Sequence, residues 1–251
     1  MTTPFQRHMK EMLAKDTKAK QVKALDAGDL KTAESTVTDY SQFEVLESSL
    51  KNDVTALANT PTGERDDLRK TFIARYLPHV EKYVESAEVY ANQILVMVMM
   101  WLFDNRDISN ALKYALVAIE QGQKMPQQFS RNLATFVADA VYEWADREVK
   151  MGHAIDPYFS QVYEKLNEWP VPEVIHMKYN KMLGTLAFEN EQWQEALQFL
   201  EKANKYGTAN NPAKVKTKLD KARAELGIYK TKVEAEAKTE NSDNAKAVDN
   251  E

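Results

Sequence analysis

Few residues of this 251-residue chain are suited to catalysis or metal binding. It has no cysteine, which excludes a disulfide, a thiolate nucleophile and a thiolate metal site. The four histidines are far apart in the sequence, and no two form the H-x-x-x-H pair of a helical zinc site; they are His8, His79, His153 and His176. Neither G-x-x-x-x-G-K-[ST] nor G-x-G-x-x-G occurs, so no glycine-rich loop would hold a nucleotide phosphate. We therefore predict no catalytic residue, no metal and no cofactor.

One group of acidic residues has the spacing of a cation site. Asp139, Glu143 and Asp146 follow one another at intervals of four and three, which places their carboxylates on one face of a helix. The same spacing is typical of a solvated helix face, and we favour that interpretation. A metal-dependent endonuclease built on these three carboxylates stays open as an alternative.

Basic residues gather in two segments, although the net charge of the whole chain is −5. Residues 1–25 carry six basic and two acidic side chains, and so do residues 212–230, which gives +4 in each segment. Lysine and arginine at such places bind phosphates by releasing counterions, with little base selectivity. The predicted DNA contacts are first Arg7, His8, Lys10, Lys15, Lys18, Lys20 and Lys23, and second Lys214, Lys216, Lys218, Lys221 and Arg223. The alternative for either segment is a solvated basic helix face.

Apolar residues recur at helical intervals along most of the chain, which predicts an all-α fold. Residues 4–27 form a mostly polar pattern that ends at Gly28 and has one narrow stripe, namely Phe5, Met9, Met12 and Leu13. Residues 29–58 have a near-heptad repeat, which predicts a long coiled-coil-like helix. Such a helix requires a partner helix, in the same chain or in another subunit. The predicted subunit contacts on it are Val37, Tyr40, Phe43, Leu46, Leu50 and Val54.

The rest of the chain predicts a multi-helix array. Residues 88–103 are apolar on nearly all sides, as expected of a buried central helix. Pro78 predicts a kink or a helix start, because proline cannot donate a backbone hydrogen bond. Gly184 lies inside an apolar helix, where a missing side chain would let another helix approach closely. Further helices are predicted over residues 64–86, 108–121, 130–152, 156–168, 173–189, 192–206 and 212–226, the last with Pro212 in its first turn.

Two stretches of the chain resemble each other. Residues 103–112 align without gaps on residues 188–197, at an offset of 85 positions, and Gly122 matches Gly207 at the same offset. In both stretches an Ala-Leu pair would let the second helix of a hairpin pack tightly on the first. The pattern is similar to degenerate tetratricopeptide hairpins. A tetratricopeptide-like adaptor that binds only proteins is therefore an alternative function.

The sequence also predicts how the chain is divided and where it resides. The N-terminus has no apolar signal-peptide core, and the longest apolar run, residues 94–103, is about half a membrane span. We therefore expect a soluble cytoplasmic protein with no membrane contact. The predicted divisions are a basic DNA-contact segment (1–28), a long amphipathic helix and linker (29–63), a central helical core (64–152), C-terminal helical hairpins (153–227) and a disordered tail (228–251).

Several motifs, taken in order, resemble the small terminase subunits of peduovirus-type temperate tailed phages. They are Pro4-Phe5-Gln6-Arg7-His8-Met9, Leu77-Pro78 with Val80, Met97-Val-Met-Met-Trp101-Leu-Phe-Asp104, Asp107-Ile108, Ala111-Leu112, Ala115, Ala118, Gly122 and Met125-Pro126. The similarity covers about residues 4–150 and continues more loosely to Ala196-Leu197. The family's basic, Pro/Lys-rich C-terminal tail is short and mildly acidic here, which argues against a DNA contact by this tail.

The resemblance implies a component of the viral genome-packaging motor. Such subunits form homo-oligomeric rings, bind double-stranded viral DNA near the packaging start site and regulate the large terminase subunit, which carries ATPase and nuclease. The implied location is the host cytoplasm. Members of this family are sometimes described as endonucleases, but we expect cleavage to belong to the large subunit.

Overall fold

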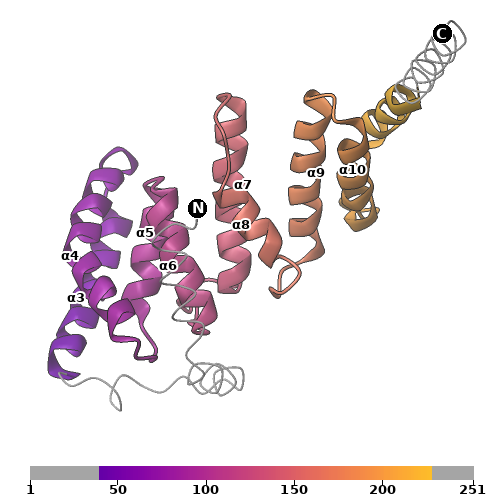
Figure 1. The fold of residues 1–251 in the computed structure, drawn as a ribbon. Coiled ribbons are helices and arrows are strands. Elements are labelled where there is room, and N and C mark those ends of the chain that lie inside the picture. The colour runs from indigo at the N-terminus through magenta and orange to yellow at the C-terminus, as the bar shows by residue number, and fades with distance from the viewer. Residues whose placement is uncertain (1–39, 228–251) are drawn as a thin grey trace, which may run out of the picture. The chain divides into compact units, whose positions relative to one another are not determined.

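The computed structural model describes residues 40–227, with side chains from residue 43 onward, and every regular element in this range is a helix (Figure 1). The predicted all-α fold is therefore confirmed. The elements are α3 (Tyr40–Asn59), η2 (Thr62–Glu64), α4 (Arg65–Ser86), α5 (Gln93–Asp104), α6 (Ile108–Glu120), α7 (Leu133–Lys150), α8 (Tyr158–Lys165), α9 (Glu173–Glu189) and α10 (Trp193–Tyr206). Residues 216–227 are also helical.

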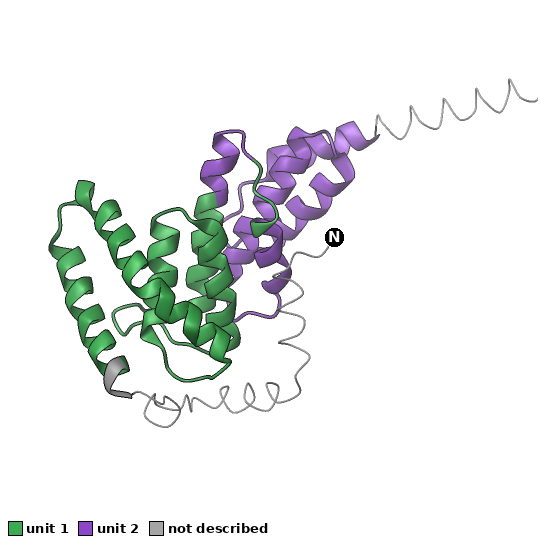
Figure 2. Ribbon diagram, turned by 60° about the vertical axis from the view of Figure 1, so that its left-hand side comes forward, with its two compact units in different colours: residues 1–144, 154–158 green, residues 145–153, 159–251 purple. Residues whose placement is uncertain are grey.

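The described residues divide into two compact units (Figure 2). Unit 1 comprises residues 40–144 and 154–158, and unit 2 comprises residues 145–153 and 159–227. The division falls within α7, because this helix contributes its first part to unit 1 and its last turns to unit 2.

Helix α5 is the centre of unit 1. Every side chain from Ile94 to Phe103 is buried, as the apolar pattern predicted. Trp101 of α5 meets two rings of α4, with centroids 5.6 Å from Phe72 and 6.2 Å from Tyr76. The helix begins five residues later than predicted, because the Asn92 side chain accepts a hydrogen bond from the Leu95 N–H at 2.9 Å and caps it.

The partner helices of α3 lie in its own chain. Its stripe residues Phe43, Leu50 and Leu57 are buried, and the Phe43 ring packs edge-on against Tyr90 at 5.4 Å. Part of the predicted subunit-contact stripe is therefore covered by the protein's own core. The neighbouring helix α4 runs through Pro78 without ending, so no helix starts at this proline, and the kink stays a prediction.

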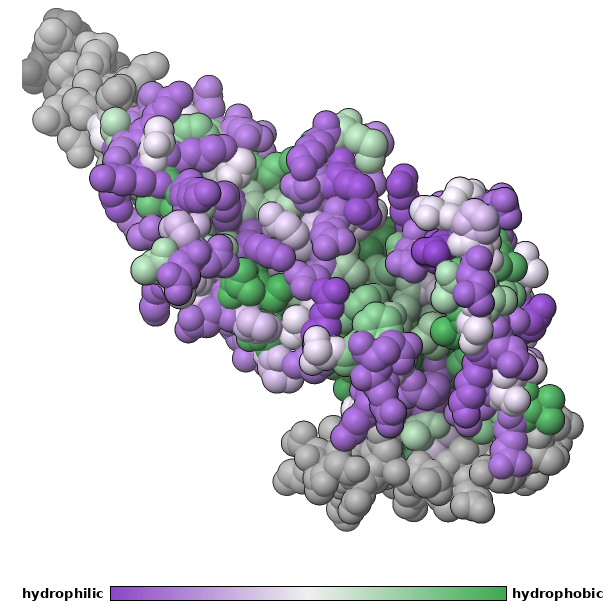
Figure 3. Space-filling model, turned by 180° about the vertical axis from the view of Figure 1, so that it is seen from behind, coloured by the Kyte–Doolittle hydropathy of each residue, from purple (hydrophilic) through white to green (hydrophobic). Residues whose placement is uncertain are grey.

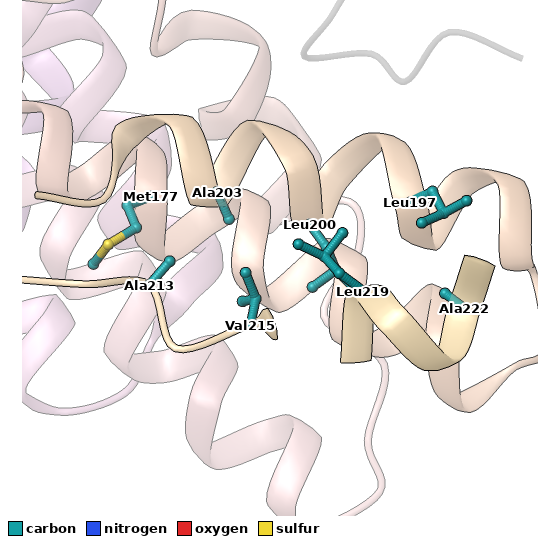
Figure 4. Close-up of a cluster of buried hydrophobic side chains, with 8 residues drawn as sticks. All are labelled: Met177, Leu197, Leu200, Ala203, Ala213, Val215, Leu219 and Ala222. Atoms are coloured by element: carbon teal, nitrogen blue, oxygen red, sulfur yellow. The ribbon is translucent and has the colours of Figure 1, made fainter. Parts of the chain in front are cut away.

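Unit 2 is built on the hairpin of α9 and α10, and its core is completed by residues 213–222 (Figure 4). Gly184 of α9 faces Leu200 of α10 so closely that an added Cβ would lie 2.7 Å from the leucine Cγ. The predicted close approach at this glycine is confirmed. The shared core residues are Met177, Leu197, Leu200, Ala203, Ala213, Val215, Leu219 and Ala222.

The last helix begins later than the sequence suggested. Residues 212–215 are not helical, and Lys214 has a φ of +56°. Ala213 and Val215 are 3% and 2% exposed, so this irregular stretch buries both side chains before the helix starts at residue 216. The placement of Pro212 in a first helical turn was therefore wrong.

The internal similarity corresponds to two hairpins with matching turns, α5–α6 and α9–α10. Arg106 and Glu191, which align at the offset of 85, have φ values of +64° and +59°. The match does not extend to the glycines: Gly122 has a φ of +66°, whereas Gly207 is extended at −72°. The two turns are equivalent, but the ends of the hairpins differ. The similarity to tetratricopeptide hairpins stays a prediction.

The exposed face seen in Figure 3 is mostly hydrophilic, with hydrophobic side chains visible in patches between the polar ones. Two large apolar side chains of the described residues are strongly exposed: Val45 at 66% and Met151 at 58%. Among the helices of residues 40–227, none has both the length and the hydropathy that a membrane crossing requires.

Candidate functional site

An open groove of about 870 Å³ lies along α3 in unit 1. Helix α3 forms one wall, the first turns of α5 contribute Gln93 and Met97, and the loop of residues 124–128 forms the other wall. The complete lining is Glu47, Leu50, Lys51, Val54, Thr55, Gln93, Met97, Lys124, Met125, Pro126, Gln127 and Gln128. An apolar lining with polar and charged side chains around it is suited to binding one face of an amphipathic segment.

A buried hydrogen-bond network fixes the loop that leads into the groove wall. The Tyr83 hydroxyl donates to Gln121 Oε1 at 2.8 Å and accepts from Gln123 Nε2 at 3.1 Å. Gln123 also donates to the Tyr90 carbonyl at 2.7 Å and accepts from the Asn92 N–H at 2.8 Å. Burial raises the pKa of Tyr83, so its hydroxyl stays protonated and can donate.

Sequence reasoning did not single out this network. The available signal was a pair of glutamines on either side of Gly122, at the end of an apolar helix. Because a glutamine in such a place is exposed in most proteins, only the tertiary structure shows that Gln121 and Gln123 are buried.

A second polar contact holds α3 against α4. The Tyr76 hydroxyl donates to Asp53 Oδ2 at 2.8 Å, and the Arg75 guanidinium forms an ion pair with the same carboxylate. The Arg75 guanidinium also lies over the Phe72 ring, 5.5 Å from its centroid. Burial and the neighbouring Asp53 carboxylate raise the pKa of Tyr76 to about 12. This contact fixes the position of the α3 wall of the groove.

The predicted subunit contacts fall into three groups. Val37 and the side chain of Tyr40 lie outside the described residues. Phe43 and Leu50 are buried in unit 1, whereas Leu46 and Val54 are partly exposed. Of the six, Val54 and Leu50 also line the groove.

The first group of predicted DNA contacts lies outside the described residues: Arg7, His8, Lys10, Lys15, Lys18, Lys20 and Lys23. The second group lies on residues 214–223 of unit 2, where some charge is neutralised within the chain. Lys218 pairs with Glu189 at 3.4 Å, and Arg223 pairs with Glu201 at 2.9 Å. Within residues 40–227, the exposed Lys214, Lys216 and Lys221 form no ion pair.

An aromatic pair lies beside this basic segment. The rings of Phe188 and Trp193 pack edge to face at 5.4 Å, and both are partly exposed. The ammonium groups of Lys218 and Lys221 lie 5.3 Å and 5.5 Å from the Phe188 centroid. These cation–π contacts hold both ammonium groups on one side of the helix formed by residues 216–227.

The three acidic side chains considered as a cation site do not share one set of contacts. Asp139 pairs with Arg131 at 2.9 Å and Asp146 with Lys150 at 2.6 Å, while Glu143 is exposed. No three histidine or acidic side chains in the described part of the chain come together as a metal site would require. The three carboxylates are thus not gathered within residues 40–227, and the endonuclease alternative stays a prediction.

Comparison with known proteins identifies the family. Residues 48–174, about half of the chain, match the family model described as "Phage small terminase subunit". The chain therefore belongs to the phage small terminase subunit family, as the resemblance predicted. This match contains the network and every residue that lines the groove except Glu47, whereas the basic residues 214–223 lie outside it.

Two relatives are phage proteins with terminase names. The chain is 35% identical over 165 residues to a protein of Haemophilus phage HP1 named "Probable terminase, endonuclease subunit", a match that covers 64% of this chain and 59% of the relative. It is 25% identical over 227 residues to "Terminase, endonuclease subunit" of Escherichia phage P2, over 90% of this chain and 86% of the relative. No solved structure matches the chain.

Proposed function

We propose that this phage terminase small subunit binds double-stranded viral DNA, assembles into a homo-oligomeric ring and recruits or regulates the large terminase subunit in the host cytoplasm. The observation that carries the proposal is the family match over residues 48–174, together with basic segments on both sides of it. Small subunits that act in packaging have to meet DNA, the motor subunit and one another, so separate surfaces for these contacts are expected.

The DNA contact is assigned to the basic segments because phosphate neutralisation requires exposed cations. In unit 2, Lys214, Lys216 and Lys221 are exposed and free of ion pairs within the described residues. Residues 1–25 supply a second set with a net charge of +4. Both sets lie on a chain of net charge −5, so the rest of its surface is expected to repel DNA and to limit contacts to these segments.

The ring contact is assigned to α3, whose stripe is only partly used within the chain. Leu46 remains partly exposed, Val54 is partly exposed toward the groove, and Val45 on a neighbouring face is 66% exposed, so Leu46 and Val45 are the side chains left for this contact. Apolar side chains in such places are typical of protein contacts when they lie together on one helix.

The alternatives differ in testable ways. The names of both relatives include the words endonuclease subunit, which favours an activity on DNA for those proteins. For this chain, the endonuclease alternative predicts that the protein purified without the large subunit nicks DNA. It also predicts that this nicking is lost when Asp139, Glu143 and Asp146 are changed to alanine. A tetratricopeptide-like adaptor predicts no retention on DNA at low salt.

The proposed DNA contact is tested by charge reversal in two matched triple variants. One changes Arg7, Lys10 and Lys15 to glutamate, and the other changes Lys214, Lys216 and Lys221. A control reverses Lys82 and Lys205, two exposed lysines elsewhere, one in each unit.

Fluorescence anisotropy with a labelled duplex should show at least a ten-fold weaker affinity, on the order of one kcal/mol or more, in the triple that removes the true contacts. The dependence of log K on log salt should become shallower by about 0.9 for each phosphate that the variant no longer neutralises. If the control weakens binding as much as either triple, the contact is non-specific and the assignment is wrong.

A further inference from the structure

The groove of unit 1 is open along α3, and a segment of the same chain precedes that wall directly. Helix α3 begins at Tyr40 in the described structure, so 39 residues come before it. Leu50 and Val54, which line the groove, are only 10 and 14 residues further along the chain. The chain before Tyr40 is therefore long enough to reach the groove.

The sequence predicts how this segment would return. Residues 4–27 and 29–58 have helical patterns, and Gly28 interrupts them. Phe5 lies 23 residues before Gly28, and Lys51 lies 23 residues after it. At about 1.5 Å per residue both arms measure roughly 35 Å, so an antiparallel hairpin at Gly28 brings Phe5 beside the groove residues of α3.

The chemistry of the two surfaces also matches. The returning segment has one apolar stripe, which starts with Phe5 and Met9, and the groove has an apolar lining of leucine, valine, methionine and proline. In the same hairpin Met9 lies opposite Glu47. Burial raises the pKa of Glu47, although the nearby Lys51 ammonium lowers it, so this carboxylate is only partly hydrated at the edge of the groove.

We infer that residues 4–27 fold back on their own chain and dock the apolar stripe of Phe5 and Met9 in the groove formed by α3, α5 and residues 124–128. In this arrangement Arg7, Lys10 and Lys18 fall on the opposite face of the segment, since they lie roughly half a turn from the stripe. The groove thus holds the first part of the basic segment on the body of the subunit and turns Arg7, Lys10 and Lys18 outward, whereas Lys23, eighteen residues after Phe5, falls on the side of the stripe.

The absence of cysteine makes cross-linking a direct test in the full-length protein. Gln6→Cys combined with Thr55→Cys keeps the stripe intact and places one thiol beside it and one on an exposed residue of the groove wall. His8→Cys with Gln127→Cys is a second pair, which tests the opposite wall. The control pairs Gln6→Cys with Ala74→Cys, an exposed position of α4 that does not line the groove.

A short bismaleimide should join both test pairs within a single chain at least about ten times faster than the control pair, because docking raises the effective concentration of the two thiols. Circular dichroism melting of each variant shows that the body is folded. Equal rates in test and control pairs of folded variants overturn the inference. The inference is also overturned if cross-linking a mixture of isotope-labelled and unlabelled chains yields covalent dimers. In that case the groove would be filled by the segment of a second copy.

Docking of the segment is independent of DNA binding. The cross-links report docking without DNA, whereas the charge-reversal variants report the proposed DNA contact. If the cross-linking fails, the proposed DNA contact is unaffected, and if charge reversal leaves DNA binding unchanged, the docking is unaffected.

Discussion

Arg106 and Glu191 occupy the same left-handed backbone position in two helical turns, with φ values of +64° and +59°. They are 85 positions apart, the offset of the internal similarity. Each turn is closed by the same backbone hydrogen bond, from Asp107 N to Leu102 O at 2.9 Å and from Gln192 N to Ala187 O at 2.9 Å. The chain therefore uses one turn design to join α5 to α6 and α9 to α10.

The left-handed position makes Glu191 a place where glycine is preferred. Glu191→Gly should raise the free energy of unfolding or leave it unchanged, within about 1 kcal/mol, because the relief of backbone strain is offset by chain entropy. Glu191→Val should lower it by about 1–2 kcal/mol, since a β-branched side chain resists a positive φ. Urea unfolding measures both. Equal stability of the glycine and valine variants would show that the turn does not depend on this conformation.

The packing of α9 on α10 depends on the missing side chain of Gly184. A Cβ there would lie 2.9 Å from the backbone nitrogen of Leu200, which cannot move like a side chain. Gly184→Ala should therefore lower the free energy of unfolding by about 1–3 kcal/mol through overpacking. Thr185→Ala on the same helix is the control and should stay within about 0.5 kcal/mol. An unchanged stability of Gly184→Ala would mean that the helices can separate at no cost.

The wall of the groove depends on the Tyr83 hydroxyl. Tyr83→Phe keeps the ring but leaves Gln121 and Gln123 buried without this partner, which should cost about 1–3 kcal/mol in urea unfolding. Tyr158→Phe, a tyrosine of the same unit that takes no part in the network, is the control. If both variants are destabilised equally, the network does not hold the loop.

Buried tyrosines predict a decline of stability in alkali. Burial raises the pKa of Tyr114 to about 12, whereas a tyrosine in the unfolded chain ionises near pH 10. Below about pH 10 both states keep the proton, and above it the unfolded state loses the proton first. The contribution of Tyr114 should therefore be complete below pH 10 and decline as the pH rises toward 12. Tyr114→Phe should show a smaller decline over this range in urea midpoints, and an identical decline would contradict the assignment.

The sequence was sufficient for much of the fold. Strict helical periodicity predicted the helices, the all-round apolar pattern predicted the burial of residues 94–103, and Gly184 predicted a close helix contact. These features depend on local patterns. The start of the last helix was misplaced because Pro212 is a good first-turn residue, whereas burial of Ala213 and Val215 keeps the chain irregular there.

The candidate sites were less predictable. The stripe on α3 indicated a partner helix but not which chain supplies it, because the pattern of Phe43 and Leu50 is the same in both cases. The groove joins α3, α5 and residues 124–128, which are up to 81 positions apart, and the buried glutamines behind it are polar residues without a local signal. Charge alone marked the basic segments, but the pairing of Lys218 and Arg223 with acids required the structure.

Sedimentation velocity of a dye-labelled DNA duplex, mixed with micromolar protein at low salt, reports DNA binding and assembly in a single experiment. For a ring-forming subunit that binds DNA, we expect the label to sediment faster, in complexes containing several chains, and to return to its free rate as salt is raised. A duplex that sediments at its free rate in low salt, beside a protein with the mass of one chain, would refute a DNA-binding, ring-forming small terminase subunit.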